Sequence, residues 1–408
     1  MIPKATQNQP VPSSLPVLIA FGGVSPEHEV SVLTALQAKA ALETTGTPLI
    51  PLYITKSGRW LTGNDLFNLD LYKDLPALEQ KAIPCTFAID PDGRTVLREE
   101  TRGLFQRPAS YPIDAVLIAF HGSSGENGAF QGVCEQFHLP YTGSDVTASA
   151  IGMDKIRAKQ LCRAAGIPVV DDVVIREADW VARSGEILKE IRALGPEVII
   201  KPSRLGSSIG VHRCSSTEET ETAIEDTFRY DDTLLAERAV HPLTEINCSV
   251  LGDTDHVRAS VCEQPLGAGR HLSFQDKYQS GAGKGMAAAD RIIPAKLPPD
   301  QTHAIQESAK TIFQTLGASG VARLDFLLQT DTGTFYFNEI NTIPGSFSFY
   351  LWKESGLTFD HLLLESLRIA KKQFQRRNGR VRSYETNLLS EKAAAGIKGL
   401  KGNKGAKS

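Results

Sequence analysis

The feature that most constrains the fold is an alternation of short apolar segments with glycine-rich turns and helices. Residues 17–21 form an apolar run that leads into Gly22 and Gly23, and a helix is predicted to begin near residues 26–29. Residues 115–120 form a second apolar run, again followed by a glycine-rich turn. Strands that alternate with helices indicate an α/β protein, in which ligands bind at the carboxyl ends of parallel strands.

Composition excludes several classes of protein. The chain has 408 residues, enough for two or three domains, and a net charge of −3 that gives no reason to expect nucleic acid or an anionic membrane as a partner. No apolar run approaches the roughly 20 residues that span a bilayer. Residues 1–16 also lack the apolar core of a signal peptide. We therefore expect a cytoplasmic protein that acts on small molecules.

The cysteines predict no disulfide framework. None of the six forms a C-x-x-C pair, and a chain of this size does not need disulfide staples. We expect reduced thiols that pack as small core residues. They are Cys85, Cys134, Cys162, Cys214, Cys248 and Cys262.

Later segments predict further strands and helices. A helix is expected from residue 154 to residue 166, and apolar strands at residues 198–201 and 234–237. Residues 321–328 and 334–340 flank an Asp-Thr-Gly turn and predict a hairpin. These elements follow the first α/β unit and indicate at least one more domain.

The strongest chemical signal is two pairs of polar residues on that hairpin. Arg323 and Asp325 are two residues apart, as are Glu339 and Asn341, and this spacing places both members of a pair on one face of a strand. Carboxylate and amide oxygens suit Mg²⁺, and an arginine beside them could neutralise an oxyanion or a phosphate. A solvated hairpin face is the alternative, but Asp325 lies within an apolar run, which favours the metal site.

A second signal predicts phosphate binding. Lys201 ends an apolar strand just before the loop at residues 206–210, whose backbone N–H groups could bind phosphate oxygens. Lys155 is a second candidate cation, although alone it would be an ordinary helix lysine. The segment at residues 281–285 lacks the Ser or Thr that a P-loop places after its lysine, so we interpret it as part of a mobile lid.

Five motifs, in order along the chain, resemble those of the D-alanine–D-alanine ligase family. They cover the chain from about residue 15 to about residue 370. The motifs are residues 21–31 (FGGVSPEHEVS), 121–132 (HGSSGENGAFQG), 141–155 (YTGS through MDK), 201–210 (KPSRLGSSIG) and 338–345 (NEINTIPG).

The resemblance implies the ATP-grasp fold, with an N-terminal open parallel sheet followed by two α+β lobes. It also implies an ATP-dependent ligase that joins two D-alanine molecules through an acyl-phosphate for peptidoglycan synthesis, with two Mg²⁺ ions that Mn²⁺ could replace. A homodimer is expected by analogy. The expected divisions are a flexible N-terminus at 1–16, an N-terminal domain at 17–145, a central lobe at 146–237, a C-terminal lobe at 238–373 and a basic, mobile tail at 374–408.

The resemblance also implies roles for individual residues on the nucleotide side. Lysines would hold the phosphates, a hinge segment would bind the adenine, and a glutamate would bind the ribose. The implied ATP-binding residues are Lys155, Lys201, Glu237, Arg238, Ala239, Glu245 and Lys277, the last on a closing loop at about residues 274–289. The implied metal ligands are Asp325, Glu339 and Asn341.

On the substrate side, the resemblance implies that Glu27 holds the ammonium group of the first amino acid. Arg323 and the backbone N–H of Gly345 would stabilise the tetrahedral oxyanion. Ser207 would position substrate with Tyr278 near it, and His121 would lie beside the first carboxylate.

The sequence departs from the family pattern on this side. Residues 346–352 (SFSFYLW) are shorter than the family's segment that helps bind the second carboxylate, and residues 126–128 read Glu-Asn-Gly where Glu-Asp-Gly is usual. We expect the aromatic residues of 346–352 to pack in the core. Two alternatives stay open: a ligase for another amino acid or a hydroxy acid at the second position, and a nucleotide-binding regulator without catalysis.

Overall fold

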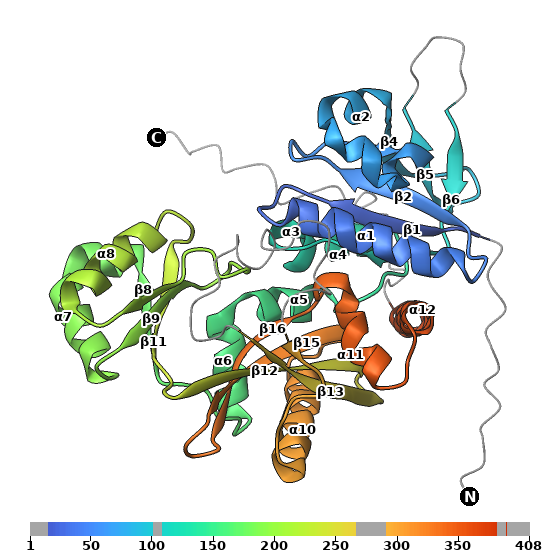
Figure 1. The fold of residues 1–408 in the computed structure, drawn as a ribbon. Helices are drawn as coiled ribbons and strands as arrows, with labels where there is room; N and C mark the ends of the chain where they lie inside the picture. The colour runs from blue at the N-terminus through green and yellow to red at the C-terminus, as the bar shows by residue number, and fades with distance from the viewer. Residues whose placement is uncertain (1–14, 101–107, 267–290, 382–388, 390–408) are drawn as a thin grey trace, which may run out of the picture.

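The computed structural model describes residues 15–100, 108–266, 291–381 and 389. It contains an N-terminal domain and two further lobes (Figure 1). Lys277, Tyr278 and the predicted lid lie outside the described residues, as does most of the predicted basic tail.

The N-terminal domain is built on a seven-stranded sheet of order β6-β5-β4-β3-β2-β1-β7. Its central strand β1 (Val17–Gly22) is fully buried and pairs in parallel with β2 (Leu49–Ile54) and β7 (Ala115–Ile118). The remaining strand pairs are antiparallel, so the open parallel sheet expected from the sequence is parallel only around β1. The antiparallel strands are β3 (Trp60–Thr62), β4 (Ile83–Ile89), β5 (Thr95–Glu99) and β6 (Ser110–Pro112).

Helices and short turns complete this domain. The helix predicted after the first strand is α1 (His28–Glu43), which packs on β1. The others are η1 (Asn64–Phe67), η2 (Leu69–Lys73), α2 (Leu75–Lys81), α3 (Ser123–Glu126) and α4 (Ala129–Gln136).

The central lobe has a four-stranded sheet of order β10-β9-β11-β8. Its strands all pair antiparallel, and β9 (Val198–Pro202) and β11 (Thr233–Arg238) match the two predicted strands. Its own apolar core includes Trp180, Ile187 and Ile224. The remaining elements of this lobe are β8 (Asp172–Arg176), α7 (Glu177–Ala193), β10 (His212–Cys214) and α8 (Thr217–Thr227). The helices α5 (Val146–Met153) and α6 (Lys155–Ala164) precede them in the chain, and Ala158 and Cys162 of α6 are buried in the core of the C-terminal lobe.

The C-terminal lobe has a five-stranded antiparallel sheet of order β14-β13-β12-β15-β16. The predicted hairpin is confirmed as β15 (Gly320–Gln329) and β16 (Phe335–Asn341). Its register places Arg323 opposite Asn341 and Asp325 opposite Glu339, so the four predicted residues do converge. The other elements are β12 (Leu243–Gly252), β13 (Val257–Pro265), β14 (Arg291–Ile292), α10 (Pro299–Thr315), η4 (Gly345–Ser348), α11 (Phe349–Glu354) and α12 (Phe359–Asn378).

The last helix, α12, ties the C-terminal lobe to the N-terminal domain. Its Leu362 and Leu363 are fully buried in the core of the N-terminal sheet. Arg377, near its end, lies 3.1 Å from a carboxylate oxygen of Glu135 and 4.7 Å from the ring centre of Tyr141. The tail boundary expected at residue 374 therefore falls inside a helix that is anchored at both ends.

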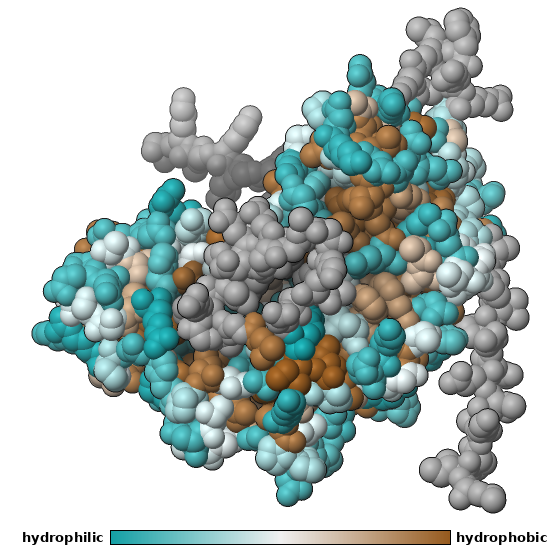
Figure 2. All heavy atoms as spheres, in the orientation of Figure 1, coloured by the Kyte–Doolittle hydropathy of each residue, from teal (hydrophilic) through white to brown (hydrophobic). Residues whose placement is uncertain are grey.

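The cysteines and the surface can be compared with what the sequence predicts. All six cysteines are reduced and buried, as predicted. On the face shown in Figure 2, apolar residues gather over the N-terminal domain and the C-terminal lobe, whereas the central lobe is largely polar. In the part of the chain that the structure describes, no helix is long and apolar enough to cross a membrane.

Candidate active site

The turn after β1 brings a carboxylate to the junction of the domains. Glu27 precedes α1, but its side chain does not cap the helix. Instead, it accepts a hydrogen bond from the hydroxyl of Ser207, which is 180 residues away in the central-lobe loop. Ser207 and Ser208 have φ angles of +55° and +58°, a left-handed conformation that costs energy in residues other than glycine and is common at functional sites. The Glu27 and Ser207 predicted from sequence therefore meet.

Glycines allow this close approach. A side chain at Gly122 (φ +67°) would begin 2.5 Å from a carboxylate oxygen of Glu27, and one at Gly206 would begin 3.3 Å from it. A methyl group cannot fit at the first distance. The Gly122 loop therefore needs glycine to bring its backbone against this carboxylate, whereas at Gly206 a shift of a few tenths of an ångström would make room.

A second carboxylate, Glu126, lies beside Glu27. It accepts hydrogen bonds from the backbone N–H of Gly122 (2.6 Å) and of Ile343 (3.3 Å), which joins the second loop to the loop after β16. Desolvation, helped by the negative charge of Glu27, raises the pKa of Glu126 to about 8. The sequence prediction of the site missed Glu126, although it lies within one of the five motifs.

His121 is held as a neutral ring. Burial lowers the pKa of His121 to about 4, so it carries no charge at neutral pH. Its Nε2 lies 2.8 Å from the hydroxyl of Thr34, which also accepts a hydrogen bond from the backbone N–H of Ser346. The histidine therefore links α1 to the segment that follows Gly345.

The described residues that were predicted to bind ATP line one cavity of about 120 Å³ between the two α+β lobes. They come from α6, β9, β11 and β12 and meet the metal hairpin there. The predicted residues that line it are Lys155, Lys201, Glu237, Arg238, Ala239, Glu245 and Glu339. A smaller cavity shares Lys155 and Glu339 with it and reaches Glu27 and Glu126. The nucleotide end and the amino-acid end of the predicted site thus adjoin.

The cations of this cavity are paired with anions. The ammonium of Lys201 lies 2.8 Å from Glu237 and donates a hydrogen bond to the side-chain oxygen of Asn338 at 3.0 Å. Burial lowers the pKa of Lys201 to about 8, despite the opposing effect of Glu237. Lys155 donates to the carbonyl of Leu205 at 2.7 Å and lies 3.2 Å from Glu339.

A third lysine of the network was not predicted. Lys159 is completely buried, and its ammonium pairs with the second carboxylate oxygen of Glu237. Lys155 and Lys159 are four residues apart on α6, a spacing that puts two side chains on one helix face. That spacing was the signal that could have found it.

The hairpin carries the expected metal-binding groups. Arg323 holds both carboxylate oxygens of Asp325 at 2.7 Å, and the amide nitrogen of Asn341 donates to Asp325 at 3.1 Å. Desolvation raises the pKa of Asp325, although Arg323 opposes the shift, so the site has room for further positive charge.

This donor set fits a hard divalent cation. No cluster of three His, Cys, Asp or Glu side chains that could hold a metal occurs within the described ranges. A site with two carboxylates and an amide suits an ion such as Mg²⁺, which takes other ligands from water and nucleotide phosphates.

A polar row crosses the C-terminal sheet at this point. The strand register aligns Glu263, Asn247, Asp325 and Glu339 on four neighbouring strands. Asn247, Arg291 and Tyr350 each donate a hydrogen bond of 3.0 Å to Glu263. The sequence analysis missed this extension, because Asn247 and Glu263 lie in strands that have no recognisable motif.

The segment after Gly345 is wound in an unusual way. Ser346, Phe347 and Ser348 have φ angles of +50°, +53° and +51°, three successive left-handed residues of which none is glycine. Phe347 and Trp352 are buried and the partly buried Phe349 packs against the same core, as predicted, whereas Tyr350 is partly buried and donates a hydrogen bond to Glu263. The segment therefore meets the site in two places, through the backbone N–H of Ser346 and through the hydroxyl of Tyr350.

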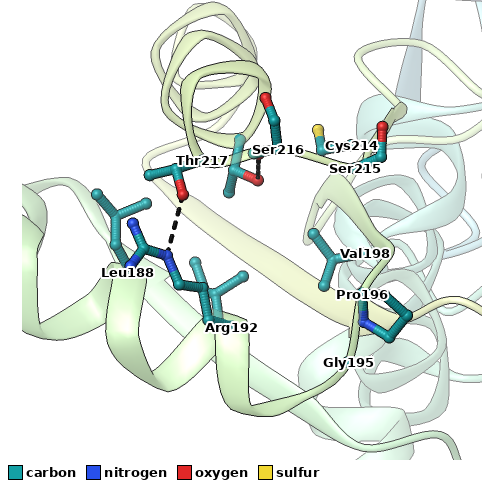
Figure 3. Close-up of a pocket in the computed structure, with 11 residues that line it drawn as sticks. Leu188, Arg192, Gly195, Pro196, Val198, Cys214, Ser215, Ser216 and Thr217 are labelled. Atoms are coloured by element: carbon teal, nitrogen blue, oxygen red, sulfur yellow. Dashed lines mark hydrogen bonds between the residues drawn. The ribbon is translucent and has the colours of Figure 1, made fainter.

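Another hollow, of about 240 Å³, lies in the central lobe between α7 and the start of α8 (Figure 3). None of the predicted site residues lines it. Ser216 accepts a hydrogen bond from the backbone of Glu219, and Glu219 accepts one from the backbone of Ser215, so the N-terminus of α8 is already capped. This hollow is not a candidate active site.

Comparisons with known proteins agree with this geometry. Residues 16–144 match the family model described as D-ala D-ala ligase N-terminus, and residues 161–367 match the D-ala D-ala ligase C-terminus. A D-alanine–D-alanine ligase of Thermosipho melanesiensis is 36% identical over 92% of this chain and 98% of its own length. D-alanine–D-alanine ligase A of Bradyrhizobium diazoefficiens is 37% identical over 90% of this chain and 98% of its own.

Solved structures are similar over most of the chain. The D-alanine–D-alanine ligase of Coxiella burnetii has a TM-score of 0.74 and 27% identity, covering 93% of this chain and 98% of its own. The VanG D-Ala:D-Ser ligase of Enterococcus faecalis has a TM-score of 0.72 and 28% identity, covering 88% of this chain and 100% of its own.

Two lobes that close a lysine-lined cavity over a carboxylate hairpin define an ATP-grasp enzyme, and the structural neighbours share this fold. Within that class, the chain belongs to the D-alanine–D-alanine ligase family. Membership implies a carbon–nitrogen ligase that uses ATP with a divalent metal.

Proposed function

We propose that this protein joins two D-alanine molecules into D-alanyl-D-alanine, a peptidoglycan precursor, with hydrolysis of ATP to ADP and phosphate. The hydrogen bond between Glu27 and Ser207 carries the proposal, because it sets a carboxylate that can bind an amino-acid ammonium against the nucleotide loop. The relatives named above, which match along almost their whole length, support the same reaction.

The nucleotide would lie in the cavity between the lobes. We assign Lys155 and Lys201 to the α- and β-phosphates, since both ammonium groups lie in that cavity. Glu237 and the backbone at Arg238 and Ala239 would bind the adenine, and Glu245 the ribose hydroxyls. Lys277, which lies outside the described residues, would bind the γ-phosphate.

Asp325, Glu339 and Asn341 would hold the divalent metal, which we propose to be two Mg²⁺ ions. When bound, these ions neutralise negative charge on the phosphates. Arg323 complements them, because its guanidinium is fixed by Asp325 at the edge of the same cluster.

The substrate end would orient the two amino acids. A carboxylate is a poor electrophile, so its oxygen first takes the γ-phosphoryl group of ATP and ADP leaves. The second amine then bonds to the carbonyl carbon and loses a proton, and the phosphate leaves with the carboxylate oxygen. Arg323 and the N–H of Gly345 would stabilise the oxyanion between these events. Glu27 would hold the first ammonium, while neutral His121 would adjoin the first carboxylate without adding charge.

A second candidate differs only in the second substrate. The left-handed turn at residues 346–348 follows Gly345 in the sequence, where the resemblance implies a longer segment that helps bind the second carboxylate. One structural neighbour is named a D-Ala:D-Ser ligase, with a TM-score almost equal to that of the D-alanine–D-alanine ligase. A D-alanine ligase with another second amino acid or hydroxy acid therefore stays a defined alternative.

The test is ADP release in the presence of single amino acids and pairs, with the peptide product identified by mass spectrometry. We expect release with D-alanine alone and little or none with L-alanine. ADP release that requires a second compound in addition to D-alanine would support the second candidate. A D-alanine reaction that is silent while an L-amino acid is active would overturn the D-alanine assignment. No ADP release with any substrate, despite ATP binding, would indicate a regulator.

A further inference from the structure

Lys159 is the most deeply buried cation near the nucleotide cavity. Its side chain is 0% exposed, compared with 6% for Lys201. It lies on α6, one turn after Lys155, but it is not one of the residues that line the cavity. Its ammonium pairs with Glu237, which does line the cavity.

Glu237 is shared between two lysines. One carboxylate oxygen pairs with Lys159 and the other lies 2.8 Å from Lys201. Both lysines lower the pKa of Glu237 against the effect of its burial, so it stays ionised. A buried carboxylate with two fixed cations has one available geometry, because each oxygen already has its partner.

This sharing bears on the cation that faces the nucleotide. Lys201 bridges from Glu237 to the side-chain oxygen of Asn338, which directly precedes the proposed metal ligand Glu339. If Lys159 were absent, both oxygens of Glu237 would be available to Lys201. The ion pair would tighten, and a phosphate would have to compete with a whole carboxylate for the Lys201 ammonium.

We propose that Lys159 is a positioning residue for the nucleotide, which by holding one oxygen of Glu237 keeps the other oxygen, and with it Lys201, in place for ATP. This inference rests on the proposed function as an ATP-dependent ligase. Lys201 would contact the nucleotide equally in the ground state and in the transition state of phosphoryl transfer. Loss of Lys159 should therefore raise the KM for ATP and leave kcat largely unchanged.

The test replaces Lys159 with methionine, which keeps the unbranched apolar part of the side chain and removes its ammonium group. We expect the KM for ATP to rise about tenfold, and the affinity for ADP with Mg²⁺ to fall by a similar factor in calorimetry. The kcat should stay within about threefold of wild type, with the KM for D-alanine unchanged. The matched control is Arg157→Met, which removes an exposed cation from the same helix and should alter none of these values.

A second variant covers the case in which Lys159→Met does not fold. Lys159→Gln keeps a hydrogen-bond donor without the charge. We expect the KM for ATP to rise in this variant too, but by less than in Lys159→Met. Folded Met or Gln variants whose KM for ATP and ADP affinity stay within twofold of wild type would overturn the proposal. An equal loss of kcat and of D-alanine affinity would also overturn it, because it would indicate general damage to the fold.

Adding Glu237→Gln to Lys159→Met separates positioning from local packing. If Lys159 acts through Glu237, the double variant should bind ADP no more weakly than Glu237→Gln alone. Independent, additive losses would contradict that route. If wild type releases no ADP with any amino acid, the proposed function fails, yet the calorimetric comparison still decides the role of Lys159.

Discussion

The two ends of the site are built in different ways. At the nucleotide end, side-chain charges pair across regular strands and one helix, as in the network of Lys155, Lys159, Lys201 and Glu237. At the amino-acid end, loops far apart in the sequence meet through backbone groups, glycines and left-handed residues. The first end therefore depends on which residue types are present, and the second on how loops are held.

The largest effect should come from the hairpin that serves both ends. Replacing Glu339 with glutamine removes one charge of the proposed metal site but keeps the shape of a partly exposed side chain. We expect kcat for ADP release to fall by about a thousandfold, with the unfolding midpoint within a few degrees of wild type. The control is Glu307→Gln, the same change at an exposed position on α10. Turnover near wild type in Glu339→Gln would refute the metal assignment.

Sequence alone could predict much of the nucleotide end, because its signals are local. The two-residue spacing of Arg323 with Asp325 and of Glu339 with Asn341 defines a strand face, and the observed register confirms their convergence. Lys201 was found from its place between an apolar strand and a glycine-rich loop.

The amino-acid end was less accessible, because its geometry depends on contacts between distant segments. No local pattern indicates that Glu126 accepts a hydrogen bond from Ile343, 217 residues away. The strand register that aligns Glu263 with Asn247 was equally hidden, because each residue looks like an isolated polar position. The expected tail boundary at residue 374 falls within α12, which continues to Asn378 and contacts Glu135 of the N-terminal domain, a contact that no local pattern indicates.

A substitution of Glu27 should affect the amino-acid end only. Replacing Glu27 with glutamine removes the negative charge that would pair with the substrate ammonium. The interaction that is lost is a hydrogen bond between two charged groups. We expect kcat/KM for D-alanine to fall about tenfold to a hundredfold. ADP affinity should stay within about twofold of wild type, since Glu27 lies outside the nucleotide cavity.

Exposed Glu29, in the first turn of the helix that Glu27 precedes, offers the matched change, Glu29→Gln, which should leave both values unaltered. Loss of ADP affinity in Glu27→Gln equal to the loss for D-alanine would mean that the two ends cannot be treated as separate.

A pH experiment probes the amino-acid end through Glu126. Because the folded-state pKa of this carboxyl is raised to about 8, the native protein holds a proton that the unfolded chain releases above its ordinary pKa. Glu126 therefore costs stability as the pH rises from about 5 to about 8, with a slope of at most about 1.4 kcal/mol per pH unit. Glutamine resembles the protonated form and lacks this titration.

We expect Glu126→Gln to gain stability relative to wild type over that pH window, measured by urea denaturation at several pH values. Below pH 5 the difference should be constant. A difference that stays constant from pH 5 to pH 8 would mean that Glu126 is ionised in the folded protein.

The smallest effect concerns the left-handed turn at the amino-acid end. Ser348 has φ +51°, and its hydroxyl has no hydrogen-bond partner among the described residues, so removing the hydroxyl should cost little. A left-handed residue other than glycine is disfavoured by about 1–2 kcal/mol, whereas glycine adopts this conformation freely. Ser348→Gly should therefore be more stable than Ser348→Ala by about 1 kcal/mol in denaturant unfolding.

Ser366 supplies the opposite case, because it is a buried serine in the middle of α12, where glycine costs about 1 kcal/mol relative to alanine. At that position, alanine should be the more stable of the two substitutions. If Ser348→Gly were less stable than Ser348→Ala, residue 348 would not be left-handed in the folded protein. If glycine is the more stable substitution at position 348 and the less stable one at position 366, the left-handed conformation after Gly345 is confirmed. Ser348→Gly can then be used to ask whether that turn restricts the choice of second substrate.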